Sequence, residues 1–196
     1  MTIYIGYVDV LHGTYDEWRN ATNGNGYNID GYYGCQCWDF ASLFWRNIGF
    51  PVSYPKITSS SAYTMWGLRD QNVAYGGVTY FDLVYNINEV KRGDIMVFNY
   101  NSNNPYGHVG FADQDFATWT PSDPNYPYEF PILSENNGGT PDPQGGALTN
   151  IHGYDYRLFL GAFRFRDWNI TPTPTEEIIR SKFPWVLYAN KIRNRY

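Results

Sequence analysis

The spacing of apolar residues changes part-way along this chain, and that change constrains the fold more than any other feature. In segment 36–48, QCWDFASLFWRNI, the large apolar residues recur three and four positions apart, which predicts an amphipathic helix. From about residue 94 onward, short apolar runs bounded by Gly, Pro and Asn clusters indicate strands. Helices first and strands afterwards predict an α+β domain whose N-terminal helices pack on an antiparallel β-sheet.

Local signals set the expected element boundaries. The TYDE sequence at 14–17 has the spacing of a capping box and predicts a short helix over Tyr15–Thr22. Gly49 and Pro51 are expected to end the helix over 36–48. A further short helix is expected over 62–69, and strands over 94–100, 108–113, 129–133 and 157–165.

Composition divides the chain into one domain and an appendage. Residues 1–168 are expected to form the domain, and the alternating prolines of TPTPTEE predict an extended linker over 169–177. The tail over 178–196 has five basic residues and no acidic one. It is expected to dock on an anionic surface or to begin a second module, and a helix packed back on the domain is the alternative.

The overall composition excludes several classes of protein. With 43% hydrophobic and 17% charged residues, the chain has enough apolar surface to fold. Its 19% aromatic content indicates rings that line a groove for sugars or peptides, unless they simply occupy tyrosine-rich strands. A net charge of −5 argues against a nucleic-acid partner.

No targeting or membrane segment is expected. The N-terminus lacks a basic start followed by an apolar stretch, so the sequence predicts no secretory signal. No apolar run approaches the roughly 18 residues of a membrane helix. We therefore expect a soluble chain without membrane insertion.

Two cysteines, Cys35 and Cys37, are separated by one residue, a spacing that would strain a disulfide. Cys37 is expected in the first turn of the helix over 36–48, where the helix dipole lowers thiol pKa and favours a nucleophilic thiolate. Backbone N–H groups there, with the Gln36 side chain, are candidates to hold an oxyanion. The alternative is an ordinary buried cysteine. A zinc site is not expected, because CxC with a distant histidine supplies only part of a tetrahedral ligand set.

A base for such a nucleophile would be a histidine. Of His12, His108 and His152, His108 stands at the start of a predicted strand in YGHVGF, and the glycine before it leaves the ring's surroundings open. A satisfied structural histidine is the alternative on these residues alone.

Four motifs together make the assignment more specific. The chain contains, in this order and with these gaps, the segments GYYGCQCWDFASLFW, RGDIMVF, YGHVGF and LSENNGG. Together they resemble the CHAP family, the cysteine- and histidine-dependent amidohydrolases and peptidases. The resemblance covers roughly residues 14–168. It implies a papain-like CHAP fold, and many members of the family are phage lysins or bacterial autolysins that cleave peptidoglycan.

The resemblance also implies roles for individual residues. Gln36 and Cys37 match the family's QC pair, and His108 matches the histidine of its GHV motif. The implied mechanism is papain-like: His108 takes the thiol proton, Cys37 attacks an amide carbonyl, and water hydrolyses the resulting thioester.

The third catalytic group is implied by the ENN sequence. Glu135 and Asn137 match an acidic residue and an asparagine of the family, and Glu135 is expected to orient the imidazolium of His108. Two alternatives stay open: Asn136 in the asparagine role, and Glu135 as a solvated turn carboxylate.

A calcium loop is expected just ahead of the nucleophile, as in some phage CHAP domains. Its oxygen ligands, at loop positions one, three, five, seven and twelve, would be Asn28, Asp30, the carbonyls of Tyr32 and Gly34, and Asp39. The loop departs from the usual pattern with Asn at position one and Tyr33 instead of glycine at position six. The alternative is a polar turn whose Asp39 faces solvent or caps the helix. No organic cofactor is expected.

The sequence thus predicts a phage-type lysin, an endolysin or a virion-associated enzyme, that cleaves an amide in the stem peptide or cross-bridge of bacterial peptidoglycan. Endopeptidase and N-acetylmuramoyl-L-alanine amidase activities are equally compatible with the motifs. The protein is expected in the host cytoplasm before release to the wall, or in the virion tail, with a virion or wall partner at its tail segment. The rivals are a non-enzymatic wall-binding or tail protein with the same fold, and a cysteine protease acting on proteins.

Overall fold

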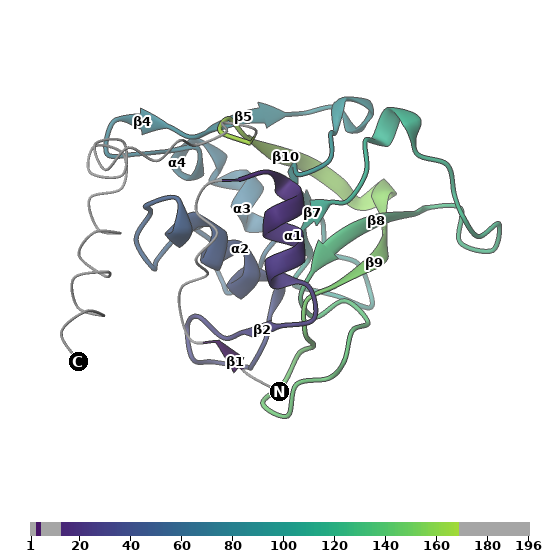
Figure 1. Ribbon diagram of the computed structural model, residues 1–196, viewed down its shortest axis with the longest axis horizontal. Coiled ribbons are helices and arrows are strands. Elements are labelled where there is room, and N and C mark those ends of the chain that lie inside the picture. Colours follow the sequence, from purple (N-terminus) through teal and green to yellow (C-terminus); the bar gives the residue numbers. More distant parts are fainter. Residues whose placement is uncertain (1–2, 5–12, 169–196) are drawn as a thin grey trace.

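The computed structural model describes residues 3–4 and 13–168 of the 196-residue protein (Figure 1). The predicted linker over 169–177 and the basic tail over 178–196 lie outside the described residues, as does most of the N-terminal stretch for which no secretory signal is predicted.

A six-stranded antiparallel sheet forms the centre of the domain, in the order β5-β10-β6-β7-β8-β9. Its strands are β5 (Phe81–Val84), β6 (Ile95–Phe98), β7 (His108–Ala112), β8 (Glu129–Ser134), β9 (Asn150–Asp155) and β10 (Phe159–Phe165). Two small ribbons complete the strands: β1 (Ile3–Tyr4) pairs in parallel with β2 (Gly26–Tyr27), and β3 (Ala74–Tyr75) pairs with β4 (Val78–Thr79). The predicted antiparallel α+β architecture is confirmed.

The helices precede most of the sheet, as the sequence predicts. They are α1 (Tyr15–Thr22), α2 (Cys37–Asn47), α3 (Thr64–Gly67) and α4 (Arg69–Asn72), with 3₁₀ turns η1 (Ile87–Glu89), η2 (Phe116–Thr118) and η3 (Tyr156–Leu158). The capping box of α1 is formed: the Glu17 backbone N–H donates to Thr14 Oγ1 at 3.4 Å, and Thr14 N–H donates to Glu17 Oε2 at 2.9 Å. The single helix expected over 62–69 is instead divided into α3 and α4. None of the helices in the described ranges is long and apolar enough to cross a membrane.

One face of the sheet packs against α1 and α2 through aromatic rings. Phe111 of β7 lies at the centre of this contact, with its ring centroid 5.2 Å from Phe40, 5.3 Å from Phe44 and 5.8 Å from Trp18. Figure 1 shows these two helices beside the central strands. The contact fixes the N-terminal end of α2, and therefore Cys37, against β7.

The other face of the sheet carries a second buried cluster. Successive residues of a strand point to opposite faces, so Met96 and Phe98 of β6 face away from α2 while their neighbours face it. Phe116, Trp119 and Tyr154 pack against this cluster. The central strands are therefore buried on both faces, which accounts for continuous apolar runs such as IMVF in β6.

Candidate active site

Cys37 is the first residue of α2, as predicted, and Gln36 precedes it in an extended conformation as the N-cap residue. The Cys37 side chain is partly accessible to solvent. Burial raises the pKa of its thiol to about 12, although hydrogen bonds from the backbone N–H groups of Val109 and Trp38 favour the thiolate. The N–H donor at the helix start lowers the thiol pKa as expected, but desolvation outweighs it in this structure.

His108 is the first residue of β7 and is only 2% exposed. Its Nε2 lies 3.0 Å from Ser134 Oγ, and its ring stacks on Tyr154 with centroids 4.5 Å apart and planes 13° from parallel. Burial lowers the pKa of His108 to about 3, so the imidazole is neutral. A neutral imidazole has a lone pair that is able to accept a proton.

Gly107 explains how the chain enters β7 at this histidine. It has φ +69°, and a Cβ there would lie 2.6 Å from both the Phe98 carbonyl oxygen and the Tyr63 Cβ. Only glycine fits this close approach and this backbone conformation without strain.

Cys37 and His108 lie near the same end of β7. The thiol of Cys37 accepts from the backbone N–H of Val109, the residue after His108. Tyr154 stacks on His108, and its pKa is raised to about 12 mainly by burial and further by its proximity to Cys37. Cys37 packs against the buried cluster on the α2 side of the sheet, and the imidazole lies against the Tyr154 ring. The hydrogen bonds of the described residues do not include one between the thiol and the imidazole in this state.

Glu135 does not occupy the position expected for it. Its Oε1 accepts from the Tyr27 backbone N–H at 2.6 Å and from Thr149 Oγ1 at 3.5 Å, and its buried Oε2 has no hydrogen-bond partner among the described residues. Burial, followed by the charges of nearby carboxylates, raises the pKa of Glu135 well above its ordinary value. The orienting contact with His108 belongs instead to Ser134, a residue that the sequence reasoning missed.

The two asparagines after Glu135 also differ from each other. Asn136, with φ +54°, donates from Nδ2 to Gln36 Oε1 at 2.8 Å, whereas the Nδ2 of Asn137 is buried without a hydrogen-bond partner among the described residues. Asn136, the alternative candidate for the asparagine role, is therefore the one that contacts the QC pair directly, through Gln36.

Cys35 lies just ahead of α2, as expected, but it has a different environment from Cys37. It is fully buried, and its Sγ donates to Asp142 Oδ2 at 3.2 Å. Burial strongly raises the pKa of its thiol. These contacts give Cys35 a structural position and leave Cys37 as the more accessible of the two thiols.

The residues of the predicted calcium loop are close together. Asp39 Oδ1 accepts from the backbone N–H groups of Ile29 and Asp30 at 2.8 and 3.1 Å, and Asn28 Oδ1 accepts from the Gly31 N–H at 2.8 Å. Burial and the charge of Asp30 raise the pKa of Asp39 to about 7. A cation would relieve this repulsion, so the donor set fits a hard cation such as Ca²⁺.

The backbone conformation of Tyr33 is compatible with a calcium loop. Tyr33 stands where calcium loops usually have glycine, and it adopts φ +61°, the left-handed conformation that glycine normally supplies. The groups of three or more His, Cys, Asp or Glu side chains that hold many metals are absent from the described residues, but the predicted set has only two carboxylates and relies on amide and carbonyl oxygens.

Comparison with known families agrees with this geometry. The model of the CHAP domain family matches residues 22–120, about half of the chain. The chain belongs to the CHAP domain family. The matched segment of this CHAP domain includes Gln36, Cys37 and His108 and ends before Ser134 and Glu135.

A curated relative and a solved structure extend the comparison. The chain is 35% identical over 104 residues to a protein of Streptococcus phage B30 named D-alanyl-L-alanine endopeptidase; the matched part is 52% of this chain and 22% of that protein. The crystal structure of wild-type endolysin LysIME-EF1 has the same fold with a TM-score of 0.55 at 18% identity, covering 93% of this chain and 86% of that one. The resemblance to CHAP domains and the α+β fold are thereby confirmed.

Proposed function

We propose that this CHAP domain is a peptidoglycan hydrolase that cleaves an amide bond in the peptide part of the bacterial cell wall, with Cys37 as nucleophile and His108 as base. One observation carries the proposal: the sulfur of Cys37, at the start of α2, is hydrogen-bonded to the backbone of Val109 directly beside His108. A reachable thiol at a helix start next to a neutral imidazole is the arrangement that thiol-dependent amide hydrolysis requires.

In this proposal the two nitrogens of His108 have different roles. In the tautomer with hydrogen on Nε2, that N–H donates to Ser134 Oγ, and Nδ1 keeps its lone pair. Nδ1 is then the atom that takes the proton from Cys37. The imidazole must come within hydrogen-bond reach of the thiol for this transfer, and such contacts commonly tighten only when substrate is bound.

The reaction then proceeds in two halves. As His108 removes the thiol proton, the sulfur of Cys37 bonds to the substrate carbonyl carbon, and the C–N bond breaks while His108 returns the proton to the leaving amine. In the second half His108 takes a proton from water, whose oxygen attacks the thioester. The C–S bond breaks, and Cys37 regains its proton.

The oxyanion of each tetrahedral intermediate would be held at the start of α2. The first N–H groups of a helix have no partner within the helix and point toward its N-terminal end. Gln36 donates one amide hydrogen from Nε2 to the Tyr33 carbonyl at 2.7 Å, which leaves the second for substrate. The bond from Asn136 to Gln36 Oε1 holds the amide in this orientation.

We propose endopeptidase rather than amidase chemistry, because the relative from Streptococcus phage B30 is named for an endopeptidase activity between D-alanyl and L-alanyl residues. This chain corresponds to only 22% of that protein, so the bond itself has to be measured. Action at the bacterial wall as a phage lysin, free or virion-associated, follows from the same proposal.

We further propose that the loop formed by Asn28, Asp30, Tyr32, Gly34 and Asp39 binds Ca²⁺. The ion would supply positive charge between two carboxylates and hold the loop that leads into α2. The support is the raised pKa of Asp39 beside Asp30 and the left-handed Tyr33.

The test compares wild type with Cys37→Ser and Cys35→Ser on Gram-positive cell walls, following turbidity and then the released fragments by mass spectrometry. We expect wild type and Cys35→Ser to clear walls and Cys37→Ser to lose activity, with new alanine amino ends in the fragments. Release of free stem peptide at the lactyl amide would assign an amidase instead. Wall binding without any new amino groups would support the non-enzymatic rival.

A further inference from the structure

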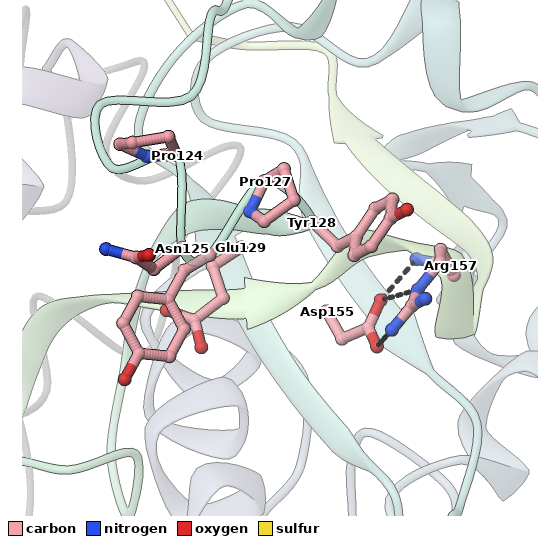
Figure 2. A pocket seen from close by; sticks show the side chains of 8 residues that line it. Pro124, Asn125, Pro127, Tyr128, Glu129, Asp155 and Arg157 are labelled. Carbon is pink, nitrogen blue, oxygen red and sulfur yellow. Dashed lines mark hydrogen bonds and ion pairs between the residues drawn. The ribbon is translucent and has the colours of Figure 1, made fainter.

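A pocket of about 460 Å³ lies away from the cysteine and histidine, at the opposite end of β8 and β9. Figure 2 shows its walls, which come from the loop before β8 and from the end of β9 with the turn that follows it. Glu129 opens β8 and Ser134 closes it, so at about 3.3 Å per residue the pocket is roughly 17 Å from the catalytic end. We propose that this pocket binds an N-acetylated hexosamine of the glycan strand, which deepens and rests on the proposed wall hydrolase function.

An ion pair, a cation–π contact and a backbone hydrogen bond link the walls of the pocket. Arg157 lies over the Tyr128 ring with its guanidinium carbon 3.9 Å from the centroid, and it donates to both carboxylate oxygens of Asp155 at 2.9 and 2.6 Å. The Tyr156 backbone N–H donates to the Tyr128 carbonyl at 3.0 Å, which ties the two walls together. Side chains already held by such contacts lose less entropy on binding than free ones.

The loop that supplies the other wall is also fixed in shape. Asp123 Oδ1 accepts from the backbone and side-chain nitrogens of Asn125 at 2.8 and 3.0 Å, and the Tyr126 N–H donates to the Asp123 carbonyl at 3.1 Å. Pro124 and Pro127 restrict the backbone on either side. Tyr126 is nevertheless 58% exposed, so the loop holds an aromatic ring in contact with water.

The chemistry of these walls suits a sugar better than a simple ion. Tyrosine offers an apolar ring face together with a hydroxyl, and a ligand pocket typically combines such rings with a few placed polar groups. Asp155 is already neutralised by Arg157, and the Glu129 carboxylate has no ion pair among the described residues, so it is able to accept hydrogen bonds from hydroxyls or an acetamido N–H. Donors, acceptors and a ring face are thus all present, with the Glu129 carboxylate as the one charge of the lining that has no ion pair among the described residues.

The position of the pocket suits the polymer that the enzyme would cleave. Every stem peptide of peptidoglycan is attached to a glycan strand, so a sugar site displaced from Cys37 would hold the wall while the peptide lies at the catalytic end. Binding at both places raises the effective concentration of the peptide.

The first experiment measures binding of a tetramer of N-acetylglucosamine to the full chain carrying Cys37→Ser, by calorimetry. We expect saturable binding that Tyr126→Ala weakens about 10-fold and Glu129→Gln also weakens. Tyr85→Ala is the matched control, because Tyr85 is a 63% exposed tyrosine beside β5, at the other edge of the sheet. Absence of binding, or binding that Tyr126→Ala leaves unchanged, would overturn the proposal.

A second measurement separates this proposal from the hydrolase itself. With active-site residues intact, Tyr126→Ala is expected to cleave a sugar-free stem peptide at the wild-type rate and to clear intact walls more slowly. Binding of the tetramer through Tyr126 without cleavage of any peptide would contradict the proposed function alone. Salt-sensitive binding of the stem peptide at Tyr126, without binding of the tetramer, would assign the pocket to the peptide and overturn the sugar proposal.

Discussion

His108 Nε2 lies 3.0 Å from the hydroxyl oxygen of Ser134 on the neighbouring strand β8, while the ring stacks on Tyr154. These two contacts fix both the direction and the plane of the imidazole. Asn104 extends the support, because its Nδ2 donates to the Gly107 carbonyl at 2.9 Å and contacts the Tyr154 hydroxyl at 3.5 Å. The histidine is therefore held by a serine and a tyrosine, and the carboxylate of Glu135 faces elsewhere.

Ser134→Ala is expected to lower kcat about 10-fold with little change in KM, because an imidazole without a partner at Nε2 no longer favours the tautomer with a free Nδ1. Ser134→Thr keeps the hydroxyl and is expected to retain more of the kcat. Steady-state kinetics on a stem-peptide substrate, with thermal melting of each variant, provide the measurement. A loss of activity that only follows a loss of folded protein would contradict a positioning role for Ser134.

The reactivity of Cys37 is expected to rise steadily with pH. Burial holds the pKa of Cys37 at about 12 and that of His108 at about 3, so between these values the resting pair is a neutral thiol and a neutral imidazole. Below pH 12 each unit of pH should raise the thiolate fraction, and hence the rate of alkylation by iodoacetamide, about 10-fold. The measurement uses a Cys35→Ser background; a rate that is already constant between pH 5 and 8 would instead indicate a thiolate–imidazolium pair.

Acid is expected to destabilise the fold through His108. Its pKa in the folded protein is about 3, below the value of about 6.5 in an unfolded chain, so the unfolded state binds the proton first as the pH falls. The free energy of unfolding should therefore decrease from about pH 6.5 toward pH 3. Urea unfolding of wild type and His108→Gln across this range gives the comparison, and an equal pH dependence in both proteins would exclude His108 as the cause.

Glu135→Gln is expected to retain most of the activity, because the glutamine Oε1 still accepts from the Tyr27 N–H and the raised pKa of Glu135 already favours the neutral form. Glu135→Ala should instead destabilise the fold by about 1–3 kcal/mol, since a buried backbone donor would lose its acceptor. Melting temperatures and kcat of both variants distinguish the roles. Full stability with no activity in Glu135→Gln would restore the orienting role that the family resemblance implies.

The sequence predicts best those elements whose signal is local. The capping box at Thr14 gives the first helix with its observed bounds, and the helical spacing after Gln36 gives α2 within a residue at each end. The apolar runs give β6 and β7. By contrast, β9 was missed, because NIHGYD is polar and contains glycine, and it becomes a strand only through its six pairings with β8.

The choice between Ser134 and Glu135 as the partner of His108 depends on strand pairing and cannot be predicted from local sequence. Ser134 and Glu135 are adjacent, and successive residues along an extended chain point in opposite directions, so only one of them is able to reach the face on which His108 lies. That choice depends on how β8 pairs with β7, where Phe111 is opposite Leu133. No local pattern in LSENNGG contains this information, whereas the positions of Cys37 and His108 follow from a helix start and a strand start.

Calcium is expected to stabilise the protein more at pH 8 than at pH 5. Asp39 has a folded pKa of about 7, above its unfolded value, so it is mostly protonated at pH 5 and charged at pH 8, where burial of the charge and repulsion from Asp30 lower stability. A bound Ca²⁺ would offset that repulsion and add about 2.7 kcal/mol at 100 times its Kd. Melting with and without EDTA should show the shift in wild type and in the control Asp70→Asn, which lacks a carboxylate in a different part of the chain. Asp39→Asn should lose the shift and, without calcium, should be at least as stable as wild type above pH 7; a calcium shift that survives Asp39→Asn would place the ion elsewhere.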